Sequence, residues 1–178
     1  MHVLTDKELY EAIEYARNID ETNGRKVMES FQIEQPALSQ TLFNILPSLI
    51  AQQNQDMANV FMELTFDAIC VYQYTFGKVP TQTEEWLERQ VALLDAELQS
   101  LNPNKHMDAK IREKLTDRFS DRAINEMTQV KLIEILNESI DDYAAESTDR
   151  IPYIKFTQTM VFAVIRLLSN LYSQQDKQ

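Results

Sequence analysis

Residues 57–76 read MANVFMELTFDAICVYQYTF, and this stretch decides the fold. Apolar side chains fall on nearly every side of a helix drawn through it, which is typical of a helix in the middle of a bundle. Gly77 follows directly and Pro80 comes soon after, a combination that commonly ends a helix. The sequence therefore predicts a central helix over residues 57–76 that is closed by Gly77.

Shorter helices are expected before this central one. Thr5 and Glu8 have the spacing of a capping box, so a first helix should begin there and run to about Glu21. Gly24 is expected to end that helical pattern, since glycine is the usual residue after a last turn. A second, short helix should then follow and stop before Pro36, because the residue before a proline avoids helical torsion angles.

Prolines shape the third expected helix. Pro36 suits its first turn, and Pro47 removes a backbone N–H inside the same pattern, so a kink or break is predicted there. Asp56 is the expected N-cap of the central helix. The side chains expected to face the core from the third helix follow a spacing of three and four residues: Leu38, Leu42, Ile45 and Leu49.

Four further helices are expected after Gly77. Thr81 or Thr83 should cap one that ends near Asn102, and the last helix has apolar residues on two faces, so it is either central or shared with a partner chain. We expect a single all-α domain over residues 1–178, a bundle of seven to eight helices with 57–76 and 151–174 at its centre. The other two expected helices cover about 105–119 and 122–147.

Composition excludes several functions. Only two glycines occur, both are interpreted as helix stops, and none is left for a phosphate-binding loop. The net charge of −11 argues against nucleic-acid partners and anionic membranes. A lone cysteine, Cys70, and two histidines offer no metal cluster, so no cofactor is expected. Without a signal-like N-terminus or a long uncharged apolar segment, we expect a cytoplasmic protein with no membrane association.

The central helix carries one polar stripe, which contains a pair of carboxylates one turn apart, Glu63 and Asp67. Such a pair could hold Mg²⁺ or Mn²⁺, or share a proton if it is buried. A simpler interpretation is that the stripe is the solvated side of the helix. Its members are spaced by four or three residues: Asn59, Glu63, Asp67, Cys70 and Tyr74.

Two short acidic motifs suggest an alternative, enzymatic function. Residues 84–88 read EEWLE and residues 138–141 read ESID, with Glu138 and Asp141 one turn apart. Together they resemble the metal-binding helices of the all-α nucleoside triphosphate pyrophosphohydrolases. The resemblance implies a Mg²⁺- or Mn²⁺-dependent phosphohydrolase. In this alternative hypothesis Glu63 and Asp67 of the polar stripe are the metal ligands, joined by Glu138 and Asp141. In this chain a further expected helix separates the two motifs.

The leading hypothesis is a non-catalytic helical protein that acts through protein–protein association. We expect it to form a homodimer, and the sequence does not identify any other protein partner. The expected interface is the last helix together with the fifth helix, in which Leu87, Val91, Leu94 and Leu98 form a seam and Trp86 lies next to it. A third hypothesis is a regulator that binds a small apolar ligand in a pocket lined by Tyr72, Tyr74 and Phe162.

Overall fold

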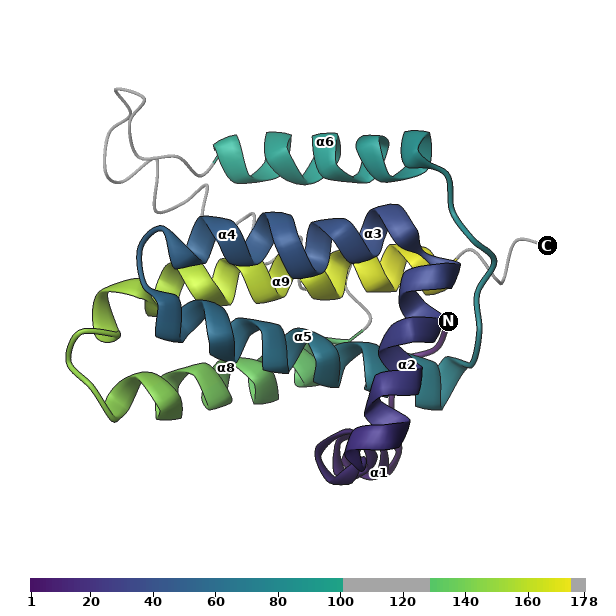
Figure 1. Cartoon of the computed structure of the whole chain (residues 1–178), viewed down its shortest axis with the longest axis horizontal. Helices are drawn as coiled ribbons and strands as arrows, with labels where there is room; N and C mark the ends of the chain where they lie inside the picture. The colour runs from purple at the N-terminus through teal and green to yellow at the C-terminus, as the bar shows by residue number, and fades with distance from the viewer. Residues whose placement is uncertain (101–128, 174–178) are drawn as a thin grey trace.

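The computed structural model describes residues 1–100 and 129–173, except the side chains of residues 95–100. Within these ranges the chain is all-α and contains no strand (Figure 1). The expected helix over 105–119 and the start of the one over 122–147 lie outside the described residues. The elements are α1 (Asp6–Asn18), α2 (Glu21–Glu34), α3 (Pro36–Gln40), a π-helix η1 (Thr41–Ile45), α4 (Leu46–Ala51), α5 (Gln55–Phe76), α6 (Glu84–Ser100), α8 (Val130–Ala145), a 3₁₀ turn η2 (Ile151–Tyr153) and α9 (Ile154–Tyr172).

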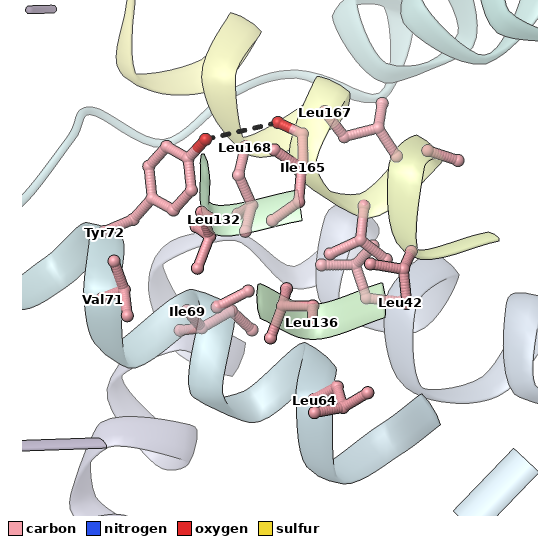
Figure 2. Packing of buried hydrophobic residues seen from close by; sticks show 14 of the residues in the cluster. Leu42, Leu64, Ile69, Val71, Tyr72, Leu132, Leu136, Ile165, Leu167 and Leu168 are labelled. Atoms are coloured by element: carbon pink, nitrogen blue, oxygen red, sulfur yellow. Dashed lines mark hydrogen bonds between the residues drawn. The ribbon is translucent and has the colours of Figure 1, made fainter. Parts of the chain in front are cut away.

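The central position of α5 and α9 is confirmed. Helices α1, α4, α8 and α9 all pack against α5, while α8 and η2 adjoin α9. Leucine, isoleucine and tyrosine side chains of α5, α8 and α9 interlock between them (Figure 2), and burying one such aliphatic side chain contributes about 1.5–3 kcal/mol. The fully enclosed ones include Ile69, Tyr72, Ile140, Ile165 and Leu168.

Both apolar faces of α9 point into this core. Met160, Val164 and Leu167 on one face are buried, as are Val161 and Ile165 on the other. Helix α9 is therefore central to the bundle and does not offer either face to a partner. Residues 151–172 are long and apolar enough to cross a membrane by length and composition alone, but packing in the core already explains that composition.

One polar contact joins the two central helices. The Tyr72 hydroxyl lies 2.7 Å from Ser169 Oγ and 3.5 Å from the carbonyl oxygen of Ile165 (Figure 2). Burial raises the pKa of Tyr72 far above its usual value, so the phenol stays neutral. The pair gives a buried hydroxyl the partner it needs in an apolar core.

Several helix ends agree with the sequence. The Thr5 and Glu8 capping box is present, with Glu8 N–H donating to Thr5 Oγ1 at 3.3 Å and Thr5 N–H donating to Glu8 Oε2 at 2.8 Å. Gly77 caps α5 with a φ of +74° and a ψ of −149°. The Thr83 hydroxyl accepts from the Trp86 amide at 3.2 Å at the start of α6.

Two predicted helix ends are wrong. Gly24 does not stop a helix but lies buried inside α2, which begins earlier because Asp20 caps it by accepting from the Asn23 amide at 3.0 Å. A Cβ atom on Gly24 would meet Phe66 Cζ at 3.4 Å, an ordinary contact distance, so this glycine packs against a ring of α5. Asn54, not Asp56, caps α5 by accepting from the Met57 amide at 2.9 Å.

The predicted disturbance at Pro47 takes the form of a π-turn. The Leu46 amide donates to the Thr41 carbonyl, one residue further back than in an α-helix, so η1 holds one extra residue. The helical phase shifts with it: Leu38 and Leu42 are buried as expected, but Ile45 and Leu49 are 51% and 40% exposed. Pro47 and Ile50 occupy the buried face in their place.

Two buried glutamines hold the connecting segments. Gln35, 3% exposed, donates from Nε2 to the Pro80 carbonyl at 3.0 Å and accepts from the Gln82 amide at 3.1 Å. Gln129 accepts from the Leu4 amide at 3.1 Å and donates to the His2 carbonyl at 2.8 Å. Each amide thus satisfies the extended backbone of a distant segment.

Candidate functional site: two hollows that meet at Arg17

The polar stripe of α5 does not face one environment. Asn59 and Glu63 are exposed, Cys70 is fully buried, and Tyr74 is half exposed and stacks on Tyr15 with ring centroids 4.8 Å apart. Burial raises the pKa of the Cys70 thiol to about 12, with the charge of Asp67 adding to the effect, so the thiol is unreactive. The interpretation of a solvated side therefore holds for Asn59, Glu63 and Tyr74 but not for Cys70.

Asp67 lies on α5 between the exposed Glu63 and the buried Cys70. Its side chain is 20% exposed, and its one charged partner among the described residues is Arg17, with Nε 4.0 Å from Oδ2. No hydrogen bond to this carboxylate occurs in that part of the chain. Burial raises its pKa to about 6; Arg17 opposes this shift and the charge of Glu63 adds to it.

Arg17 connects three helices. It lies in the last turn of α1, reaches Asp67 of α5 through Nε, and donates from Nη2 to Ser139 Oγ of α8 at 3.1 Å. The side chain also lines two separate hollows, one on each side of it. Arg17 is therefore the residue through which the candidate sites adjoin each other.

The first hollow, the α1–α8 groove, measures about 550 Å³. Both helices pack on α5 but not closely on each other, and side chains bridge them at two places, Lys131 with Asp6 and Arg17 with Ser139. Its apolar lining comes from Leu9, Ile13 and Ile135, and its acidic lining includes Glu14, Glu134 and Glu138.

The second hollow, the α5 hollow, measures about 540 Å³ and lies where α1, α2, η1 and α5 meet. Its polar end is made by Arg17, Glu63 and Asp67. The π-turn places Phe43 in its wall, and such turns are frequent at functional sites. The remaining walls are apolar: Ala16, Met28, Met62 and Phe66.

The four candidate metal-binding carboxylates do not converge. Glu63 and Asp67 line the α5 hollow, Glu138 lines the α1–α8 groove, and Asp141 accepts a hydrogen bond from Gln158 Nε2 at 2.9 Å elsewhere on α8. Within residues 1–100 and 129–173, no three His, Cys, Asp or Glu side chains are placed to hold a metal ion. The cleft expected for the phosphohydrolase alternative is absent from this part of the chain.

The two acidic motifs are also apart. Helix α6, with Glu84, Glu85 and Glu88, lies at the top of Figure 1, whereas α8, with Glu138, lies at the bottom. The central helices separate them. The resemblance to the pyrophosphohydrolase metal helices therefore has no counterpart in the arrangement of α6 and α8.

The expected seam on α6 is largely internal. Trp86, Leu87 and Leu94 are buried, Val91 is 40% exposed, and the side chain of Leu98 is outside the described residues. The residues expected to line an apolar pocket do not share one environment. Tyr72 is enclosed in the core, while Tyr74 is on the surface.

A scan against protein-family profiles, a search of curated proteins and a search of solved structures each gave no match. The spacing of Glu63 and Asp67 along one helix predicts the two carboxylates of the α5 hollow. It does not predict Arg17 and Phe43, which come from other helices. An arginine in the last turn of a helix indicates only a favourable position near the helix C-terminus.

Proposed function

We propose that this protein is a helical interaction module whose α1–α8 groove receives a basic amphipathic segment of a partner protein. The supporting observation is the combination of an apolar lining with acidic side chains in one groove between two helices. Amphipathic helices commonly bind in apolar grooves of this kind through side chains spaced by three and four residues.

The charges in the groove favour a basic occupant. Its two cations are engaged, Lys131 with Asp6 and Arg17 with Asp67 and Ser139. Glu134 and Glu138 make no ion pair within the described residues, and there the Glu14 carboxylate accepts one hydrogen bond, from the Tyr10 hydroxyl at 3.1 Å. Lysine or arginine side chains of a partner would complete these carboxylates, and the net charge of −11 would steer such a partner from a distance.

The apolar lining supplies the other half of the recognition. Ile13 and Ile135 are partly buried, and Tyr10 beside them is 64% exposed. An exposed tyrosine at the edge of an apolar groove is a suitable contact, since tyrosine is enriched at binding hot spots. Two or three apolar side chains of a partner helix would cover these groups.

A direct test uses a labelled synthetic helix with leucine on one face and lysine on the other, measured by fluorescence anisotropy at about 0.15 M salt, where the Debye length is about 8 Å. The double variant Glu134→Lys/Glu138→Lys should weaken binding at least about tenfold, roughly 1.4 kcal/mol. The matched control Glu29→Lys/Glu88→Lys has the same net charge and changes exposed acids outside the groove. Equal weakening by the two variants would contradict the proposal.

Self-association through α6 is a second candidate. Val91 and Leu93 of α6 are 40% and 61% exposed, and in the same helix the buried Nε1 of Trp86 has no hydrogen-bond acceptor within the described residues. If two copies meet there, Leu93→Glu should convert a dimer into a monomer in multi-angle light scattering. A wild-type protein that is monomeric at micromolar concentration would rule this candidate out.

A further inference from the structure

The α5 hollow is shallow and open to solvent, with a volume and a lining that can contact a small molecule. Its volume of about 540 Å³ falls within the range of about 300–1,000 Å³ typical of ligand pockets. Two aromatic rings, Phe43 and Phe66, and two flexible thioethers, Met28 and Met62, form its apolar walls. Methionine adapts its shape to what it contacts, so these walls suit a ligand body of moderate size.

The polar end of the hollow has an incomplete set of partners. The Asp67 carboxylate is mostly buried, yet no hydrogen-bond donor reaches it within the described residues. Arg17 Nε at 4.0 Å is beyond hydrogen-bond distance, and this guanidinium already donates to Ser139. A partly buried carboxylate without donors is costly, so a ligand that brings N–H groups would be favoured there.

The local charges select the sign of the ligand. Two carboxylates, Glu63 and Asp67, face a single guanidinium, Arg17, and no other charged side chain among the described residues lines the hollow. A cation is therefore attracted more strongly than an anion.

We propose that the α5 hollow binds a small organic cation with an apolar body, its ammonium group between Glu63 and Asp67 and its body against Phe43, Phe66 and the two methionines. An ammonium has three N–H donors, enough to bond both carboxylates at once. This site is separate from the proposed partner groove, although Arg17 lines both.

The test uses 2-phenylethylammonium as the probe and 2-phenylethanol as its uncharged counterpart, titrated into the full chain by calorimetry and by amide NMR. The ammonium should bind at least about tenfold more tightly than the alcohol and shift the amide signals of η1 and the middle of α5. No saturable binding, equal affinity for the two probes, or shifts confined to another region would overturn the proposal.

Variants locate the site. Asp67→Asn keeps the size of the side chain and removes its charge, and it should lower the affinity for 2-phenylethylammonium at least about tenfold. Glu29→Gln removes an exposed charge of α2 outside the hollow and should leave the affinity unchanged. An unaffected Asp67→Asn protein, or equal loss in both variants, would refute the assignment.

The two proposals fail separately. Glu134→Lys/Glu138→Lys should weaken peptide binding at least about tenfold and leave amine binding intact, because neither residue lines the α5 hollow. If the peptide does not bind but the amine does, the ligand site stands and the partner groove does not.

Discussion

Arg17 Nε lies 4.0 Å from Asp67 Oδ2, so the guanidinium attracts this mostly buried carboxylate without hydrogen bonding to it. The attraction does not offset the loss of water, because the pKa of Asp67 rises from its usual 3.8 to about 6. Burial of the ionised carboxylate is therefore unfavourable. Perturbed pKa values of this kind cluster at functional sites.

This relationship predicts a pH dependence of stability. Since the folded-state pKa is raised, the folded protein binds the proton more tightly than the unfolded chain does, and the contribution of Asp67 is fully present below about pH 4 and lost as the pH rises through about 6. Asp67→Asn should thus be more stable than the wild type at pH 7.5, by about 1–3 kcal/mol, and nearly equal to it at pH 4. Urea unfolding at both pH values measures the difference. A variant that is less stable at pH 7.5 would contradict the burial argument.

The two glycines should respond oppositely to the same substitution. Gly77→Ala forces a side chain into a backbone conformation that is essentially restricted to glycine, so it should destabilise the protein by about 1–3 kcal/mol although no atom lies within 4 Å of the added Cβ. Gly24→Ala adds a methyl group inside a helix at ordinary contact distance from Phe66, and it should stabilise by about 0.5–1 kcal/mol. Thermal unfolding of the two variants side by side checks the signs, and a loss of stability in Gly24→Ala would show that the Phe66 ring cannot adjust.

The buried hydroxyl pair of the central helices should show coupling. Tyr72→Phe leaves Ser169 Oγ without its partner, and Ser169→Ala leaves the phenol with only the distant Ile165 carbonyl; each should cost about 1 kcal/mol. The double variant removes both polar groups and should cost less than the sum of the two. Denaturant unfolding of all four proteins completes the cycle, and strict additivity would mean that the two hydroxyls do not interact.

The Gln35 contacts predict a pH-sensitive variant. In Gln35→Glu the side chain loses its donor to Pro80 and becomes a buried carboxylate when ionised, which should destabilise the protein by about 1–3 kcal/mol at pH 7 and by less at pH 4, where the protonated acid can donate. At pH 7 the α6 amides of the variant should exchange hydrogen faster than those of the wild type, because residue 35 no longer holds the segment that leads to α6. Gln32→Glu, an exposed change in the same helix, is the control.

The sequence predicted the centre of the fold well because strong, uniform signals mark it. An apolar surface on all sides of residues 57–76 and two apolar faces on 151–172 leave few places for these helices except the core. The capping box at Thr5 and the glycine after Phe76 are equally local. Signals of this type need no knowledge of the partner helices.

The wrong or missing predictions concern positions whose structural role depends on residues far away in the sequence. Glycine inside a pattern either ends a helix or lies within one, and Gly24 does the second, where it packs against the ring of Phe66 from α5. The candidate site is similar: spacing along α5 singled out Glu63 and Asp67, but Arg17 and Phe43 reach them from α1 and η1. No spacing rule within one helix predicts such a meeting.

The π-turn at Thr41–Ile45 bears on how this chain tolerates a change of length. The turn holds one residue more than an α-helix would, so Leu38 and Leu42 before it and Pro47 and Ile50 after it keep to one buried side. An uninterrupted α-helix one residue shorter, without the exposed Asn44, would bury the same four side chains. The extra residue thus lies inside a helix, at the wall of a ligand-sized hollow, and not in the surface connections where changes of length usually gather.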